Sequence, residues 1–159
     1  MKFFVIATAI VAVAFFFLGC AAIPEWGGPK QVSDWAYAPA SIVVHPLSRF
    51  RNSSKQDEDA MIIVHIVFLD GDGFACRGLG DLTVSLTNNQ HATLSIETVN
   101  LEDEDNNRLR FDNVTRSYRV HFDQLPEQLN RVWIQATLLA SGGELIKSKR
   151  HLLVNRKNN

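Results

Sequence analysis

Apolar residues alternate with polar ones along much of this chain, and this period of two restricts the fold more than any other feature. Between Met61 and Leu69 both sets of alternate positions are largely apolar, which predicts a central strand buried on both faces. Leu82–Leu86 and Ser117–Phe122 alternate apolar with polar residues, which predicts strands buried on one face. Less regular strands are expected at Ser41–Leu47 and Thr93–Val99.

Two further strands, Val132–Leu139 and Glu144–Val154, flank Ser141-Gly142-Gly143, a glycine pair that suits a tight hairpin. About seven short strands separated by turn signals are typical of a β-sandwich. The sequence therefore predicts an all-β fold, a single antiparallel β-sandwich over residues 41–154, followed by a polar tail at 155–159. The 46% hydrophobic content is that of a globular chain.

The chain begins with Lys2 and an apolar run from Phe3 to Leu18 that only Thr8 interrupts. A helix of that length spans about 24 Å, which is short of a hydrocarbon core of about 30 Å and disfavours a transmembrane anchor. A positive start, an apolar centre and a small residue, Gly19, are the parts of a cleaved signal peptide over residues 1–19. Ordinary secretion and a retained anchor are the alternatives.

Phe17-Leu18-Gly19-Cys20 resembles the lipobox of bacterial lipoproteins, although Phe17 stands where that family usually has Leu or another aliphatic residue. The resemblance implies that Cys20 becomes the new N-terminus and carries a thioether-linked diacylglycerol. Several acyl chains, palmitate among them, would then hold the protein stably at a membrane. We expect no cofactor other than this covalent lipid.

Residues 20–40 are rich in Pro and Gly, which predicts a flexible tether between the lipidated cysteine and the folded body. Trp26 and Trp35 lie in this stretch and are expected to pack onto the domain, the headgroup level and a partner being the alternatives. Ala21 and Ala22 follow Cys20. Enterobacterial lipoproteins retained in the inner membrane have an aspartate first, so the chain resembles the outer-membrane class.

The charge is close to neutral, with 16 basic and 17 acidic side chains over the whole chain. Lys and Arg are scattered rather than clustered, which disfavours binding to nucleic acid or to a membrane through a polybasic surface. We therefore expect an envelope protein as the partner, and the membrane to be reached through the lipid anchor.

Glycines and aspartates are densest between Asp70 and Gly80, a composition that predicts sharp turns. The segment resembles the first turn of transthyretin-like and carboxypeptidase-regulatory-like sandwiches, in which Asp70, Gly73 and Gly78 match the pattern and Ala75 and Cys76 replace the usual Pro and Val. The resemblance covers about twenty residues. It implies a transthyretin- or immunoglobulin-like sandwich and no active site.

A calcium-binding loop is the alternative interpretation of this segment, with Asp70, Asp72 and Asp81 as candidate ligands at positions one, three and twelve. Phe74 and Ala75 occupy the fifth and sixth positions, where an oxygen ligand and a glycine are needed, so an EF-hand is excluded.

Three other candidates are more simply explained by structure. Cys76 is expected to be a buried small hydrophobe rather than a nucleophile. His65 and His121 lie on strands that are able to bring them together, but ordinary strand histidines are expected instead of a zinc pair. The acidic run at 102–107 is expected to be an extended, solvated loop.

These observations predict a membrane-anchored envelope lipoprotein with a non-enzymatic structural or protein-interaction role, and they favour the outer over the inner membrane. The alternative function is a small-ligand or calcium-binding module that uses the Asp70–Asp81 loop.

Overall fold

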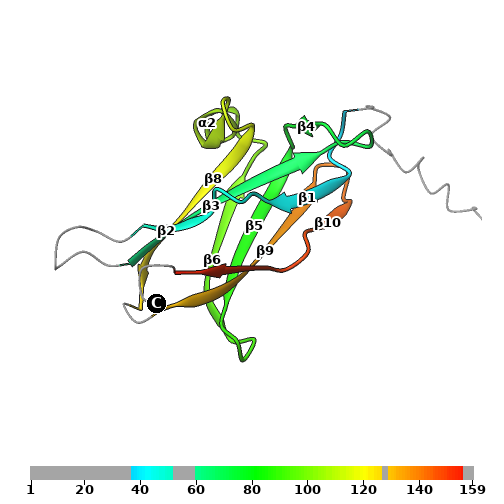
Figure 1. The fold of residues 1–159 in the computed structure, drawn as a ribbon. Helices are drawn as coiled ribbons and strands as arrows, with labels where there is room; N and C mark the ends of the chain where they lie inside the picture. Colours follow the sequence, from blue (N-terminus) through cyan, green and yellow to red (C-terminus); the bar gives the residue numbers. More distant parts are fainter. Residues whose placement is uncertain (1–36, 52–59, 127–128, 156–159) are drawn as a thin grey trace, which may run out of the picture. The chain divides into compact units, whose positions relative to one another are not determined.

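The computed structural model describes residues 37–51, 60–126 and 129–155. They form two antiparallel β-sheets that enclose one apolar core, with a single short helix at one end (Figure 1). The predicted all-β sandwich is therefore confirmed. The predicted signal peptide, Cys20, the two tether tryptophans and residues 156–159 of the predicted tail lie outside the described residues.

The first sheet is built around β3 (Ala60–Leu69), which pairs along both of its edges. One edge is covered by β1 and β2, the other by β8 and β4, and β7 pairs with β8. The bounds of these strands are β1 (Ser41–Val44), β2 (Arg49–Arg51), β4 (Ala75–Cys76), β7 (Phe111–Asp112) and β8 (Ser117–Leu125).

The second sheet is built around β9 (Arg131–Ala140), between β5 on one side and β10 and β11 on the other, with β6 outside β5. The remaining bounds are β5 (Gly80–Thr87), β6 (Thr93–Asn100), β10 (Leu145–Lys147) and β11 (His151–Val154). β1 and β2 lie along the same edge of β3, and β10 and β11 lie along the same edge of β9. Apart from the two-residue β7, the strands therefore occupy seven positions in the two sheets, as the sequence predicts.

Alternate residues of the facing strands fill the space between the sheets. The even-numbered positions of β3 from Ile62 to Phe68 are all fully buried, and so are Leu82, Val84 and Leu86 of β5. The opposite face of β3 is also covered, since Ile63, His65 and Val67 are buried too. The predicted central strand with two buried faces is therefore confirmed.

Two edge strands predicted as continuous are interrupted. The strand predicted at Ser41–Leu47 ends at Val44 because Pro46 has no N–H to donate to the ladder. The strand predicted at Glu144–Val154 divides around Ser148, whose Oγ accepts a hydrogen bond of 2.9 Å from the backbone N–H of Ala136.

Within the acidic run at 102–107, residues 104–107 begin α2 (Glu104–Arg110), so the predicted extended loop is wrong, although residues 102–105 are exposed as predicted. Asp103 caps the helix by accepting a hydrogen bond from the backbone N–H of Asn106 at 3.0 Å. Acidic residues fill the first turn, and Arg108 and Arg110 the last. This arrangement complements the helix dipole and relieves the repulsion that argued for an extended chain.

A buried hydrogen-bond network joins α2 to the sandwich. Tyr118 Oη donates to Asn107 Oδ1 at 2.9 Å and accepts from the backbone N–H of Gly78 at 3.2 Å. Asn107 Nδ2 donates to the carbonyls of Gly78 and Leu101 at 2.9 and 2.8 Å. Tyr118 is fully buried and Asn107 nearly so, hence the groups left by a deletion have no water to replace the lost partner.

Tyr118→Phe tests this network. Loss of the hydroxyl leaves the N–H of Gly78 and the amide oxygen of Asn107 unsatisfied, so we expect the free energy of unfolding to fall by about 1–3 kcal/mol. Urea denaturation of the full chain, followed by circular dichroism, measures the change. Thr98→Val, which deletes an exposed hydroxyl on β6, is the control and should cost less than about 0.5 kcal/mol. Equal effects of the two substitutions would show that the network contributes no stability.

Gly80, at the start of β5, has a φ of +127° and a backbone in contact with β9. A Cβ here would collide with the carbonyl oxygen of Leu139 and lie 2.8 Å from the Cα of Ala140. We expect Gly80→Ala to destabilise the protein by more than about 2 kcal/mol. Gly71→Ala is the matched control, because a Cβ at Gly71 meets no atom within 4 Å. A thermal melt that moves equally in both variants would contradict this assignment.

Candidate functional site

In the Asp70–Gly73 turn, the buried side chain of Asp70 accepts hydrogen bonds from the backbone of the turn. One carboxylate oxygen of Asp70, Oδ1, accepts hydrogen bonds from the backbone N–H groups of Asp72 and Phe74, at 3.0 and 2.8 Å. Gly73 supplies the left-handed residue of the turn, with φ of +86°. Asp81 lies in β5, exposed, opposite Asn100 and Leu139.

Within the described residues no three His, Cys, Asp or Glu side chains are grouped to hold a metal ion. The structure therefore does not bring Asp70, Asp72 and Asp81 together as a set of ligands. The turn is held by an Asx hydrogen-bond pattern that needs no cation.

Cys76, predicted to be a buried small hydrophobe, is half-buried on β4 and packs against the core. Burial raises the pKa of its thiol, and the negative charge of Asp70 raises it further. A thiol with a raised pKa carries little thiolate at neutral pH and is a weak nucleophile.

A different site is found on the outer face of the first sheet. A cleft of about 330 Å³ is open to solvent there, and we call it the arginine cleft. Its lining residues are Leu47, Arg49, Arg51, Ile63, His65, Asp112, Thr115, Arg119 and His121. A second hollow of about 350 Å³, which shares Arg119 and His121, extends it toward Asn106, Leu109 and Arg110 of α2.

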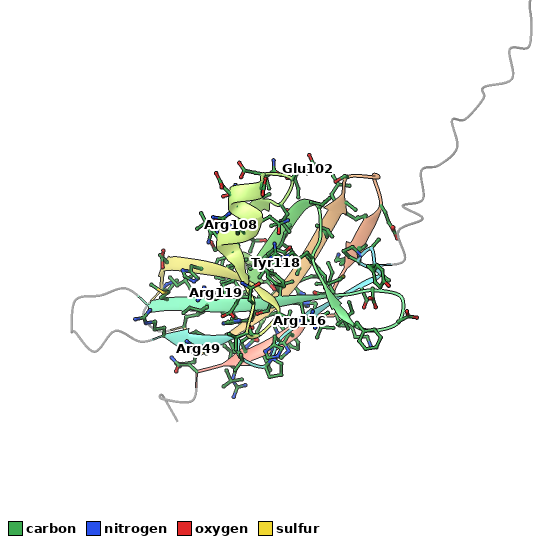
Figure 2. The ribbon with its side chains drawn as sticks, turned by 90° about the horizontal axis from the view of Figure 1, so that it is seen from above. Arg49, Glu102, Arg108, Arg116, Tyr118 and Arg119 are labelled. Carbon is green, nitrogen blue, oxygen red and sulfur yellow. The ribbon has the colours of Figure 1, made fainter. Side chains whose placement is uncertain are left out.

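Strand register places the residues of the cleft in two rows. Arg49 of β2 and His121 of β8 both lie opposite Ile63 of β3, which forms one row across three strands. His65 lies opposite Arg119 in the next row. Residues two apart on a strand share a face, so these side chains project together (Figure 2 shows Arg49 and Arg119 on either side of β3).

His65 is fixed at the floor of the cleft by turns on both sides. Ser48, after the β1–β2 turn, accepts a hydrogen bond at 3.0 Å from the backbone N–H of His65. Ser117 Oγ, at the start of β8, lies 3.0 Å from His65 Nδ1 and 2.7 Å from Oγ1 of Thr115 in the β7–β8 turn. His65 is 5% exposed as a residue, and the contact with Ser117 orients its ring.

Positive charge dominates this surface. Arg49, Arg51 and Arg119 line the cleft, against the single carboxylate of Asp112. Asp112 Oδ2 lies 3.9 Å from Arg119 Nε, while its Oδ1 accepts hydrogen bonds from the backbone N–H groups of Val114 and Thr115. Those two hydrogen bonds are the main cause of the lowered pKa of Asp112, and the charge of Arg119 adds to them.

Both histidines of the cleft favour the neutral form. Burial lowers the pKa of His65, and the charges of Arg49, His45 and Arg119 lower it further against the opposing effect of Asp112. Burial also lowers the pKa of His121, with Arg110 next, Asp123 opposing, and Arg119 and Arg51 adding to the decrease. His65 and His121 are diagonal neighbours on β3 and β8. The positive charges of the surrounding arginines disfavour the binding of a metal cation by this pair.

The chain matches no known family model, and neither the curated proteins nor the solved structures contain a significantly similar protein. Among the described residues no helix is long and apolar enough to cross a membrane. The β-sandwich is therefore assigned from its two sheets alone, and the immunoglobulin- or transthyretin-like type of sandwich stays a prediction.

The arginine cleft was not predicted from the sequence, where its arginines are far apart. Arg49 and Arg51 are separated from Arg119 by more than sixty residues, and no linear motif joins them. The readable signal was the alternation of Arg119 and His121 with the buried Tyr118, Val120 and Phe122, which placed both on an outward face.

His65→Gln tests the neutral state of the buried histidine. Because the pKa of His65 is lower in the folded than in the unfolded chain, the unfolded state binds more protons below about pH 6.5. The contribution of the neutral His65 to the free energy of unfolding is thus fully present above this pH. It is lost as the pH falls toward the pKa of His65 in the folded chain. We expect the melting temperature of wild type to fall more steeply than that of His65→Gln between pH 7.5 and pH 5.5. His151→Gln, on the other sheet, is the control, and parallel curves for wild type and His65→Gln would refute the assignment.

Proposed function

We propose that this chain is a lipid-anchored envelope lipoprotein whose β-sandwich has a non-enzymatic structural or protein-interaction role. The observation that carries the proposal is the position of Cys20, directly after an apolar leader and about twenty residues ahead of the first strand at Ser41. A signal peptide over residues 1–19 and a lipid on Cys20 would give the domain a fixed address.

A tether of about twenty residues defines the reach of the domain. Fully extended, it spans at most about 70 Å, so the sandwich would be confined to a thin layer beside the membrane. Confinement of this kind raises the effective concentration of a domain for its neighbours without any new contact. An envelope protein in the same layer is the partner that this arrangement favours, and the outer membrane is the site that Ala21 and Ala22 favour.

The chemistry of the described residues supports a binding rather than a catalytic role. Cys76 is the nucleophile candidate of the sequence, and its raised pKa and its packing against the core favour a structural role. The charged cleft on the first sheet offers arginine cations, which suit electrostatic recognition of a partner.

Cys20→Ser tests the anchor. Cells that express the full chain are grown with labelled palmitate, and we expect wild type to incorporate the label while Cys20→Ser loses at least nine-tenths of it. Cys76→Ser is the matched control, since it removes the only other cysteine and should leave the label unchanged. Mass spectrometry should then find the mature N-terminus at Cys20, carrying acyl chains.

Two results would overturn the proposal. Label that persists in Cys20→Ser would place the lipid elsewhere, and an unmodified N-terminus at another residue would indicate ordinary secretion. Crosslinking of the full chain in its native membrane then tests the partner, because a captured envelope protein that is lost in Cys20→Ser supports the tethering role.

A further inference from the structure

We propose that the arginine cleft is a binding site for a phosphate group, carried as a phosphomonoester by a small organic molecule or by a lipid headgroup. The inference goes beyond the proposed function, because it depends on the geometry of the cleft and not on the anchor at Cys20. Three observations carry it: the charge of the cleft, the donors that its side chains offer and the shape of its floor.

The charge of the cleft and its rim matches a dianion. Among the described residues, four arginines and two carboxylates lie in the two hollows or beside their histidines; they are Arg49, Arg51, Arg110, Arg119, Asp112 and Asp123. With neutral histidines, these six described groups sum to two positive charges. A phosphomonoester carries about −1.5 to −2 charges at pH 7, whereas a single carboxylate would leave half of this charge uncompensated.

The arginines have donors to spare. Each guanidinium has five N–H groups in a planar fork that matches the oxygens of phosphate. In the described part of the chain no carboxylate forms an ion pair with Arg49 or Arg51, and the one side-chain bond of Arg49 is a 3.4 Å contact from Nη1 to the carbonyl of Leu47. The contact of Arg119 with Asp112, at 3.9 Å, is made through Nε and does not use the Nη groups of the guanidinium.

The floor of the cleft accepts the organic part of a ligand. Ile63 lies at its centre, and Leu47 forms part of its wall beside the β1–β2 turn. The volume of about 330 Å³ exceeds that of a phosphate group alone and leaves room for several attached carbons. A site that combines arginine cations with apolar side chains thus favours a phosphate ester over a free inorganic ion.

Isothermal titration of the full-length protein in a neutral detergent with glycerol 3-phosphate tests this site. We expect saturable binding with a 1:1 stoichiometry, and at least a tenfold loss of affinity in the double variant Arg49→Gln/Arg51→Gln. Both arginines are exposed, so this variant should retain the wild-type melting temperature and report on binding. Lys147→Gln, an exposed position on the second sheet, is the control for a lost positive charge and should bind as wild type does.

Several outcomes would overturn the inference. They are the absence of binding at millimolar glycerol 3-phosphate, affinity that persists in the double variant, and equal binding of succinate, which has the same charge without a phosphate. A double variant that fails to fold is replaced by His121→Gln, which removes an exposed lining group of the cleft and should weaken binding at least threefold.

A competition experiment distinguishes the two sources of the phosphate. Micelles that contain phosphatidic acid are added to the complex with glycerol 3-phosphate, and micelles with phosphatidylcholine serve as the control. Displacement by phosphatidic acid alone assigns the site to a lipid headgroup, whereas no displacement assigns it to a soluble phosphate ester. Either result supports the site, and displacement by both lipids would overturn it, because phosphatidylcholine has no phosphomonoester.

Discussion

The pairing of β3 along both of its edges is the constraint on which the rest of the domain depends. Ile62, Val64 and Ile66 each pair with a neighbouring strand and fill the core with side chains that are fully buried. A slip of one residue would move this set out of the core and onto the outer face of the sheet, so the hydrophobic core fixes the register. The same register sets the alternate positions, Ile63 and His65, as the floor of the arginine cleft. Core and cleft are thus two faces of one strand.

Most of the fold was readable because local sequence and tertiary burial agree. Leu82, Val84 and Leu86 alternate with polar residues, and the structure buries those three completely. Gly143 adopts φ of +81° in the predicted hairpin, whereas Gly142 does not need a positive φ. The failures have local causes as well. A count of negative charges in the acidic run hid the helix signal, which is a capping aspartate, acidic residues in the first turn and arginines in the last.

The arginine cleft was beyond a reading of the linear sequence for a physical reason. Its residues come from the β1–β2 turn, β2, β3, β7, the β7–β8 turn and β8, and the pairing of β3 with both neighbours brings the strand residues into adjacent rows. The dense Asp and Gly residues of the turn, in contrast, are visible in the sequence. One carboxylate oxygen of Asp70, however, accepts hydrogen bonds from two backbone N–H groups of the turn itself. The dense Asp and Gly composition thus reflects the backbone geometry of a turn. The arginine cleft is instead formed by charged residues that are scattered along the sequence.

The rim of the cleft depends on the buried network as much as on the sheet. Arg110 is the last residue of α2, and that helix is held to the sandwich through the amide of Asn107 and the hydroxyl of Tyr118. A helix of seven residues is too short to be stable alone, so its place beside β8 requires these tertiary bonds. The cation that Arg110 adds beside His121 is therefore positioned by a network on the opposite face of β8, since Tyr118 and His121 alternate along that strand. Loss of the network would loosen the wall of the cleft that α2 forms. Arg49, His65 and Arg119 would keep their places because the pairing of the strands holds them.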